Sequence, residues 1–202
     1  MLMRKTDFSK VQYDMSVIIP THGRVKLLKS LFISLDKALN ESKCQVEILI
    51  IDSSEQEDSK KIESLCEKYG AKYIKGSINV REKRNIGIKE AKGEIILFVD
   101  SDCKVSQDIF KEHLKIYDTL DTAGVLGLTE FIGKESFTWE IVRRTKFLDA
   151  FYFAKTLPSY VNSAPWGTCT NLSIKKEILE KVGGFDTNFP FRLGGEIGRA
   201  HV

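Results

Sequence analysis

Residues 94–103 read EIILFVDSDC, an apolar run that leads directly into two aspartates. The unbroken apolar stretch 95–99 is typical of a strand in the centre of a sheet, where both faces are covered. Asp100 and Asp102 have the opposite requirement, because two neighbouring carboxylates repel each other and need water, a proton or a cation. The stretch therefore predicts a buried strand that ends in a polar site.

Strand-like and helix-like segments alternate along the first half of the chain. The expected strands are residues 15–19, which Pro20 should end, and residues 46–51, 71–75 and 94–99. The expected helices cover residues 24–39, 62–69 and 80–91. Beyond residue 107 we expect a helix at 109–117, a strand at 123–131, a helix with an aromatic face at 136–155, a strand at 170–174 and a helix at 175–182. Such alternation predicts an α/β fold with a central, mostly parallel sheet flanked by helices.

Polar residues follow three of the expected strands at the same relative position. Thr21–Arg24 come after the first strand, Asp52–Ser54 after the second and Asp100–Asp102 after the fourth. Ligands of such sheets bind beyond the carboxyl ends of the strands. We therefore expect the three clusters to form one site.

The Asp100/Asp102 pair suits a hard divalent cation, Mg²⁺ or Mn²⁺, which prefers oxygen ligands and keeps positions for water and substrate phosphates. A nucleoside diphosphate is a natural partner of that ion. The alternative is an Asp-x-Asp that occurs by chance as a solvated turn. The strand before the pair and the two matching clusters favour the metal.

Composition narrows the possible functions. The 202 residues are enough for one domain, and 31 Lys and Arg against 28 Asp and Glu give no basic excess for a nucleic-acid partner. The four cysteines show no metal-ligand spacing, and no signal peptide or run of roughly 20 apolar residues is evident. We expect a tail at 1–13, a domain at 14–195 and a cytoplasmic location, with peripheral attachment to the inner face of the membrane left open.

Four blocks of the sequence resemble, in order, those of glycosyltransferase family 2. They are SVIIPTHGR (16–24), VEILIIDSSEQED (46–58), REKRNIGIKEAKGEIILFVDSDC (81–103) and WGTCTNLSIKKEILEKVGGFD (166–186). The resemblance runs from about Met15 to Gly195 and implies the GT-A fold, which is like that of nucleotide-diphospho-sugar transferases. It also implies a metal-assisted, inverting transfer of a sugar from a nucleotide donor, with UDP favoured, to a glycan, lipid-linked or protein acceptor in polysaccharide or cell-envelope glycan synthesis.

The resemblance also implies roles for individual residues. Pro20, Thr21, Gly23 and Arg24 would hold the base together with Asp52, which would accept a hydrogen bond from a base N–H. The alternatives are that Thr21 is a helix N-cap and Asp52 a turn former.

Further along the chain, Arg84 would lie near the base or diphosphate. Asp100 would face the ribose and the metal, and Ser101 would also bind the nucleotide sugar. Asp102 would ligate the metal together with Asp100. Arg84 could instead be an ordinary surface charge.

Trp166 and Gly167 would cover the acceptor and donor sugar, although a tryptophan is also a common core residue. The GGFD block at 183–186 is expected to end a helix, with Phe185 buried. The family's catalytic base lies in an acidic pair shortly after this block, where Glu196 is a weak candidate.

Two other functions stay open. One is a non-catalytic nucleotide-sugar-binding fragment or pseudoenzyme. The other is a nucleotidyltransferase, which would need a glycine-rich, basic loop after the first strand, and Pro-Thr-His-Gly-Arg fits this poorly. A Rossmann dehydrogenase is disfavoured because no GxGxxG follows that strand.

The final residues, EIGRAHV, depart from the family pattern. The bases GAG ATC GGA AGA GCA CAC GTC TGA encode them with a stop codon, and all but the first base match the start of a common sequencing-library adapter. We therefore expect 196–202 to be a non-native tail and the 202-residue chain to bind nucleotide weakly and transfer little sugar. Resequencing the locus tests this, since a native frame ending at Val202 would contradict it.

Overall fold

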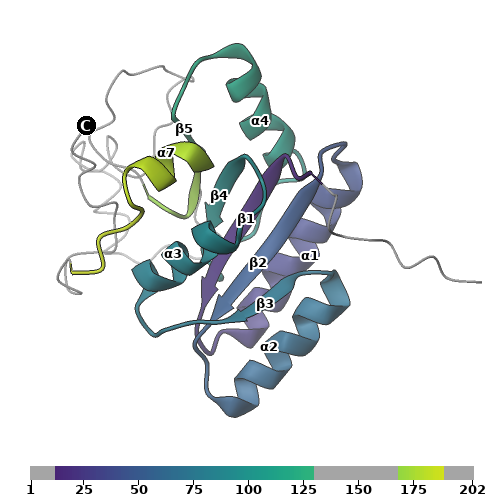
Figure 1. Cartoon of the computed structure of the whole chain (residues 1–202). Coiled ribbons are helices and arrows are strands. Elements are labelled where there is room, and N and C mark those ends of the chain that lie inside the picture. The colour runs from purple at the N-terminus through teal and green to yellow at the C-terminus, as the bar shows by residue number, and fades with distance from the viewer. Residues whose placement is uncertain (1–11, 130–167, 189–202) are drawn as a thin grey trace, which may run out of the picture.

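The computed structural model describes residues 12–129 and 168–188, which are coloured in Figure 1. The strands are β1 (Met15–Thr21), β2 (Val46–Asp52), β3 (Lys72–Lys75), β4 (Ile95–Val99), β5 (Gly124–Leu126) and β6 (Asn171–Lys175). The helices are α1 (Val25–Glu41), α2 (Gln56–Tyr69), α3 (Val80–Glu90), α4 (Ile109–Thr119) and α7 (Lys176–Lys181). The helix expected at 136–155 and the last part of the strand expected at 123–131 lie outside the described residues.

Within these ranges the strands form one sheet in the order β3-β2-β1-β4-β6-β5. β1 pairs in parallel with both β2 and β4, and β3 pairs in parallel with β2. β6 runs antiparallel to both β4 and β5. The prediction of a mostly parallel sheet with 94–99 near its centre is therefore confirmed.

Helices cover both faces of the sheet (Figure 1). Successive β1 residues alternate between the faces: Val17 and Ile19 belong to a core with residues of α1, α2 and α4, whereas Ile18 belongs to a second core with residues of α3 and α7. This alternation explains why the central strands are continuously apolar, since each face needs its own apolar set. The sheet is thus held rigidly, and its carboxyl edge is a fixed platform.

Helix α3 packs very closely on β1. A Cβ atom added to Gly87 would lie 2.6 Å from Cγ2 of Ile18, so the close approach needs a residue without a side chain. Inward-facing positions recur on this helix at Arg84, Gly87 and Ile88. The close packing brings the N-terminal half of α3 to the carboxyl edge of the sheet.

The expectation that Pro20 ends the first strand is wrong, because β1 continues to Thr21. Pro20 still pairs with Ile51 of β2, whereas the pairing with β4 ends at Ile18 and Phe98. Pro20 therefore has a paired strand on one side only, a setting in which proline is tolerated.

A buried polar cluster joins α4 to β6. His113 contacts Asn171 Oδ1 through Nε2 at 2.9 Å and Ser173 Oγ through Nδ1 at 2.8 Å. The amide nitrogen of Asn171 donates to the Leu128 carbonyl, so its oxygen faces the ring and Nε2 of His113 carries the proton. Tyr117 shares Ser173 Oγ at 2.9 Å, and burial raises the pKa of its hydroxyl to about 12. The neutral forms of both rings are favoured.

We expect this cluster to make the fold sensitive to acid. Burial lowers the pKa of His113, an effect that the Asn171 hydrogen bond opposes, so the unfolded chain binds the proton at a higher pH than the folded chain does. The free energy of unfolding should therefore fall as the pH drops from about 7.5 to about 5.5. Urea unfolding should therefore show a flatter pH profile for His113→Gln than for wild type. Equal pH profiles for wild type and His113→Gln would contradict this.

Candidate functional site at the carboxyl edge of the sheet

The loops that follow β1 and β2 are joined by hydrogen bonds. Thr21 is in register with Asp52, and the N–H of Ser53 donates to the Thr21 carbonyl at 3.2 Å. The N–H of Gly23 donates to Ser54 Oγ at 2.7 Å. Gly23 has a φ of 65°, a left-handed conformation that favours glycine. Two of the expected polar clusters therefore form one unit.

Asp52 is buried, and both of its carboxylate oxygens accept hydrogen bonds. Its Oδ1 accepts from the backbone N–H and the hydroxyl of Ser54, and its Oδ2 accepts from the Tyr73 hydroxyl at 3.1 Å. The bond to the Ser54 N–H is the turn-forming contact that the alternative interpretation of Asp52 expects. Ser54 belongs to the polar cluster that the sequence pattern indicated, whereas Tyr73 was not selected, because its contact with Asp52 depends on the fold.

Lys83 on α3 also forms hydrogen bonds with both of these loops. It is 3% exposed, and its Nζ donates to the Thr21 carbonyl at 2.6 Å and to Ser53 Oγ at 2.8 Å. Burial lowers the pKa of Lys83, and the negative charge of Asp52 opposes that shift. Sequence analysis did not select Lys83, although extending the inward face of α3 back one turn from Gly87 would have reached it.

Thr21 is buried at the end of β1. Its Oγ1 has no hydrogen-bond partner among the residues that the structure describes. It does not act as an N-cap, because Arg24 holds that position of α1. A bound ligand can supply the hydrogen-bond partner that such a buried hydroxyl lacks.

Asp100, directly after β4, is held by two side chains. Its Oδ1 lies 3.3 Å from the Arg84 guanidinium, and its Oδ2 accepts from Thr170 Oγ1 at 3.0 Å. Arg84 is 5% exposed, so it is not an ordinary surface charge. Thr170, just before β6, is a further residue that the sequence pattern did not indicate. Its contact joins segments that are 70 residues apart.

The GGFD block at 183–186 contacts both Arg84 and its neighbour Asn85 on α3. Asn85 donates to the Phe185 carbonyl at 2.9 Å and accepts from the Phe185 N–H at 2.8 Å. The Phe185 ring then packs edge-on against Phe98 and lies 5.5 Å from the guanidinium of Arg84. The expectation that Phe185 is buried is confirmed.

Asp102 contacts a different arginine. Its Oδ2 forms an ion pair with Arg24, and both side chains are about half exposed. Ser101, between the two aspartates, is buried. The third polar cluster thus joins the first through Arg24, and the three clusters lie together as the sequence pattern indicated.

The donor atoms at this edge fit a hard divalent cation. Asp100 and Asp102 supply carboxylate oxygens, the ligands that such an ion prefers, and each now contacts an arginine. Burial, with the charges of these two aspartates, raises the pKa of Cys103 to about 11, so it remains a thiol at neutral pH. No group of three or more His, Cys, Asp or Glu gathers within residues 12–129 and 168–188. Water and substrate phosphates would therefore complete the coordination, as is usual for Mg²⁺.

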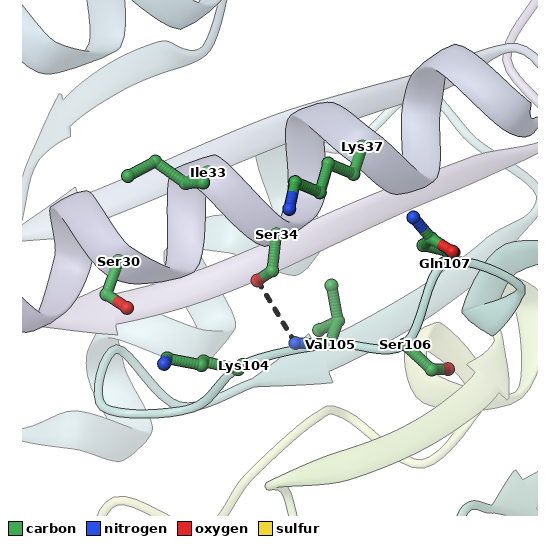
Figure 2. A pocket seen from close by; sticks show the side chains of 8 residues that line it. All are labelled: Ser30, Ile33, Ser34, Lys37, Lys104, Val105, Ser106 and Gln107. Carbon is green, nitrogen blue, oxygen red and sulfur yellow. Dashed lines mark hydrogen bonds between the residues drawn. The ribbon is translucent and has the colours of Figure 1, made fainter.

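The loop that follows Asp102 is anchored on α1. Figure 2 shows the contact, in which Ser34 Oγ accepts from the Val105 N–H at 3.1 Å. A hollow of about 490 Å³ lies between α1 and this loop, and Lys37 and Lys104 are among its lining residues. The aspartates do not line this hollow, so we assign it no part in the site.

Three predicted site residues, Trp166, Gly167 and Glu196, lie outside the described residues, as does the tail at 196–202. The remaining ones meet at one edge of the sheet. Arg84 reaches it from α3, and the strand ends and adjoining loops contribute Pro20, Thr21, Gly23, Arg24, Asp52, Asp100, Ser101 and Asp102. No helix in the parts that the structure describes is long and apolar enough to cross a membrane.

Sequence comparison assigns most of the chain to one family. The family model "Glycosyl transferase family 2" matches residues 16–183. The uncharacterized glycosyltransferase YfnE of Bacillus subtilis (strain 168) is 26% identical over 121 residues, which are 56% of this chain and 29% of that protein. The poly(ribitol-phosphate) beta-N-acetylglucosaminyltransferase TarS of Staphylococcus aureus (strain Mu50 / ATCC 700699) is 30% identical over 107 residues, 51% of this chain and 18% of TarS. The matched segments thus span less than a third of these relatives.

Solved structures share the architecture. Residues 1–349 of S. aureus TarS in complex with UDP give a TM-score of 0.63 at 20% identity, with 89% of this chain and 52% of that chain covered. The mannosyltransferase PcManGT from Pyrobaculum calidifontis, in complex with GDP-Man and Mn²⁺, gives 0.62 at 18% identity, with 89% and 49% covered. The predicted GT-A fold is confirmed by this likeness.

Proposed function

This chain belongs to glycosyltransferase family 2. We propose that it binds the donor in an enzyme that transfers a sugar from a nucleotide-diphosphate-sugar to an acceptor hydroxyl. The observation that carries the proposal is the convergence of three loops at the carboxyl edge of the sheet. Asp102 lies next to Arg24 of the loop after β1, and Asp100 lies next to Arg84 of α3.

In this proposal Asp100 and Asp102 hold Mn²⁺ or Mg²⁺. When bound, the ion would offset the negative charge that builds on the leaving diphosphate. Arg84, fixed against Asp100 and Phe185, would supply a second, permanent positive charge near the diphosphate. Thr170 would orient Asp100 by donating to Oδ2.

The base would lie against the joined loops after β1 and β2, near Thr21, Asp52 and Lys83. Asp52 can accept from an N–H of the base, and Thr21 Oγ1 has unused hydrogen-bonding capacity. Because Ser54 and Tyr73 already contact Asp52, we infer that they shift or share its carboxylate when a base binds. A uracil is favoured, since it presents an N–H between two carbonyls. The TarS complexes with UDP and UDP-GlcNAc support this choice.

The acceptor is proposed to be a glycan, a lipid-linked sugar or a protein of the cell envelope. The names of two relatives, poly(ribitol-phosphate) beta-N-acetylglucosaminyltransferase and minor teichoic acid biosynthesis protein, support an envelope polymer. Cys44, Cys66 and Cys103 form no disulfide, which suits the cytoplasm, and we propose that the enzyme works there at the inner face of the membrane.

For an inverting transfer, a carboxylate must take the proton of the acceptor hydroxyl. Glu196 is the candidate for this base if resequencing shows that the codon for residue 196 is native, and Trp166 and Gly167 are candidates for covering the sugars.

Calorimetric titration of the 202-residue chain with UDP tests the donor site. We expect binding with Mn²⁺ present and at least about 10-fold weaker binding after chelation, because the ion would bridge the diphosphate to the protein. ADP, which lacks the imide N–H, should bind more weakly than UDP. Equal UDP affinity with and without Mn²⁺ would contradict the proposal.

A second assay addresses catalysis. Release of UDP from UDP-sugars in the presence of acceptor would separate a transferase from a non-catalytic nucleotide-sugar-binding protein.

A further inference from the structure

Arg24 links the loop after β1 to the loop after β4. It is the N-cap residue of α1 and follows Gly23, whose φ is positive. Its guanidinium reaches Asp102, which lies 78 residues away in the sequence. The pair therefore spans the two sides of the proposed donor site.

The two aspartates are held in different ways. Asp100 contacts a buried arginine and a threonine hydroxyl. Asp102 contacts Arg24, and their side chains are 43% and 53% exposed. An exposed ion pair is screened by water and contributes little to stability, so its partners can exchange readily. Asp102 is thus the carboxylate that can change its cationic partner at low cost.

We propose that Arg24 competes with the divalent cation for Asp102 and moves to the donor diphosphate when ion and nucleotide bind together. This inference rests on the proposed metal site. A guanidinium recognises a carboxylate and a phosphate with the same planar arrangement of N–H donors, so Arg24 can make either contact. Arg24 thereby opposes binding of the ion alone and favours binding of the ion with its nucleotide.

The competition predicts effects of opposite sign when Arg24 is replaced. Arg24→Gln should bind Mn²⁺ alone about 2- to 5-fold more tightly than wild type, since an exposed pair no longer has to be broken. The same variant should bind UDP in saturating Mn²⁺ about 10-fold more weakly, because a charged hydrogen bond to the diphosphate is lost. A residue that simply held the ion or the fold would weaken both.

Titration of Mn²⁺ followed by electron paramagnetic resonance measures the first effect, and calorimetry with UDP measures the second. Lys26→Gln is the matched control, because Lys26 is exposed in the first turn of α1 and its replacement removes the same charge. We expect Lys26→Gln to stay within about 2-fold of wild type in both titrations. Thermal unfolding of each variant checks that the fold is retained.

The outcomes separate this inference from the proposed function. If Arg24→Gln and Lys26→Gln bind Mn²⁺ alike, or if Arg24→Gln weakens both ligands, the competition is overturned. The metal site still stands in that case if Asp102→Asn loses Mn²⁺. If Asp102→Asn binds Mn²⁺ like wild type, the metal site itself is contradicted.

Discussion

Asp102→Asn is expected to lower the affinity for UDP in the presence of Mn²⁺ by about 100-fold, and to leave the weak affinity without Mn²⁺ nearly unchanged. Loss of a partner that only orients a metal ligand costs about 10- to 100-fold in metal affinity, so loss of a ligand itself should reach the upper end. Asparagine keeps the size of aspartate but not its charge. Calorimetric titration with and without Mn²⁺ measures both affinities.

Two further variants serve as a comparison and a control for Asp102→Asn. Thr170→Val removes the hydroxyl that donates to Asp100 but leaves both carboxylates, so we expect a smaller loss of about 10-fold. Asp36→Asn removes an exposed charge from α1 and should bind like wild type. A 100-fold loss that appears equally without Mn²⁺ would mean that Asp102 contributes to the fold or contacts the nucleotide directly.

Phe98→Ala should give the largest loss of stability among the variants considered. Phe98 is fully buried in β4 at the centre of the sheet, and its ring packs edge-on against Phe185 at 5.3 Å. Replacing a buried phenylalanine by alanine costs about 3–5 kcal/mol in the free energy of unfolding. Urea unfolding of the variant and of wild type measures this difference.

The same variant should also affect the site. Phe185 lies 5.5 Å from the guanidinium of Arg84, so a cavity beneath Phe185 would loosen Arg84 and Asp100. Ile33→Ala is the matched control, because Ile33 is 45% exposed on α1 and should change the free energy of unfolding by less than about 0.5 kcal/mol. A loss below about 1 kcal/mol for Phe98→Ala would show that β4 is not the central strand of a packed core.

Within the described residues the sequence was sufficient to predict the order of strands and helices, apart from the end of β1, and the edge at which polar residues meet. Strand β4 is apolar at each position because both faces of the sheet are covered, and Asp100 follows where the cover ends. Asp52 and Thr21 share a register position because each ends a parallel strand. These features follow from local patterns and from the geometry of parallel strands.

The partners of those residues could not be predicted in the same way. Lys83 and Thr170 reach the site because α3 packs closely on β1 and because β6 runs antiparallel to β4. Neither contact has a local signature, since each joins residues at least 60 positions apart. The continuation of β1 through Pro20 likewise depends on where the pairing with β4 ends.

The central claim is that one divalent ion joins the Asp100/Asp102 pair to a nucleotide diphosphate. Pulsed electron–nuclear double resonance on bound Mn²⁺, with aspartate labelled by ¹³C in its carboxylate and UDP as ligand, tests this directly. We expect ¹³C coupling from ligating carboxylates and ³¹P coupling from the diphosphate on the same ion, with the ¹³C coupling lost in the Asp100→Asn, Asp102→Asn double variant. Protein-bound Mn²⁺ that shows ³¹P coupling without ¹³C coupling would contradict the claim.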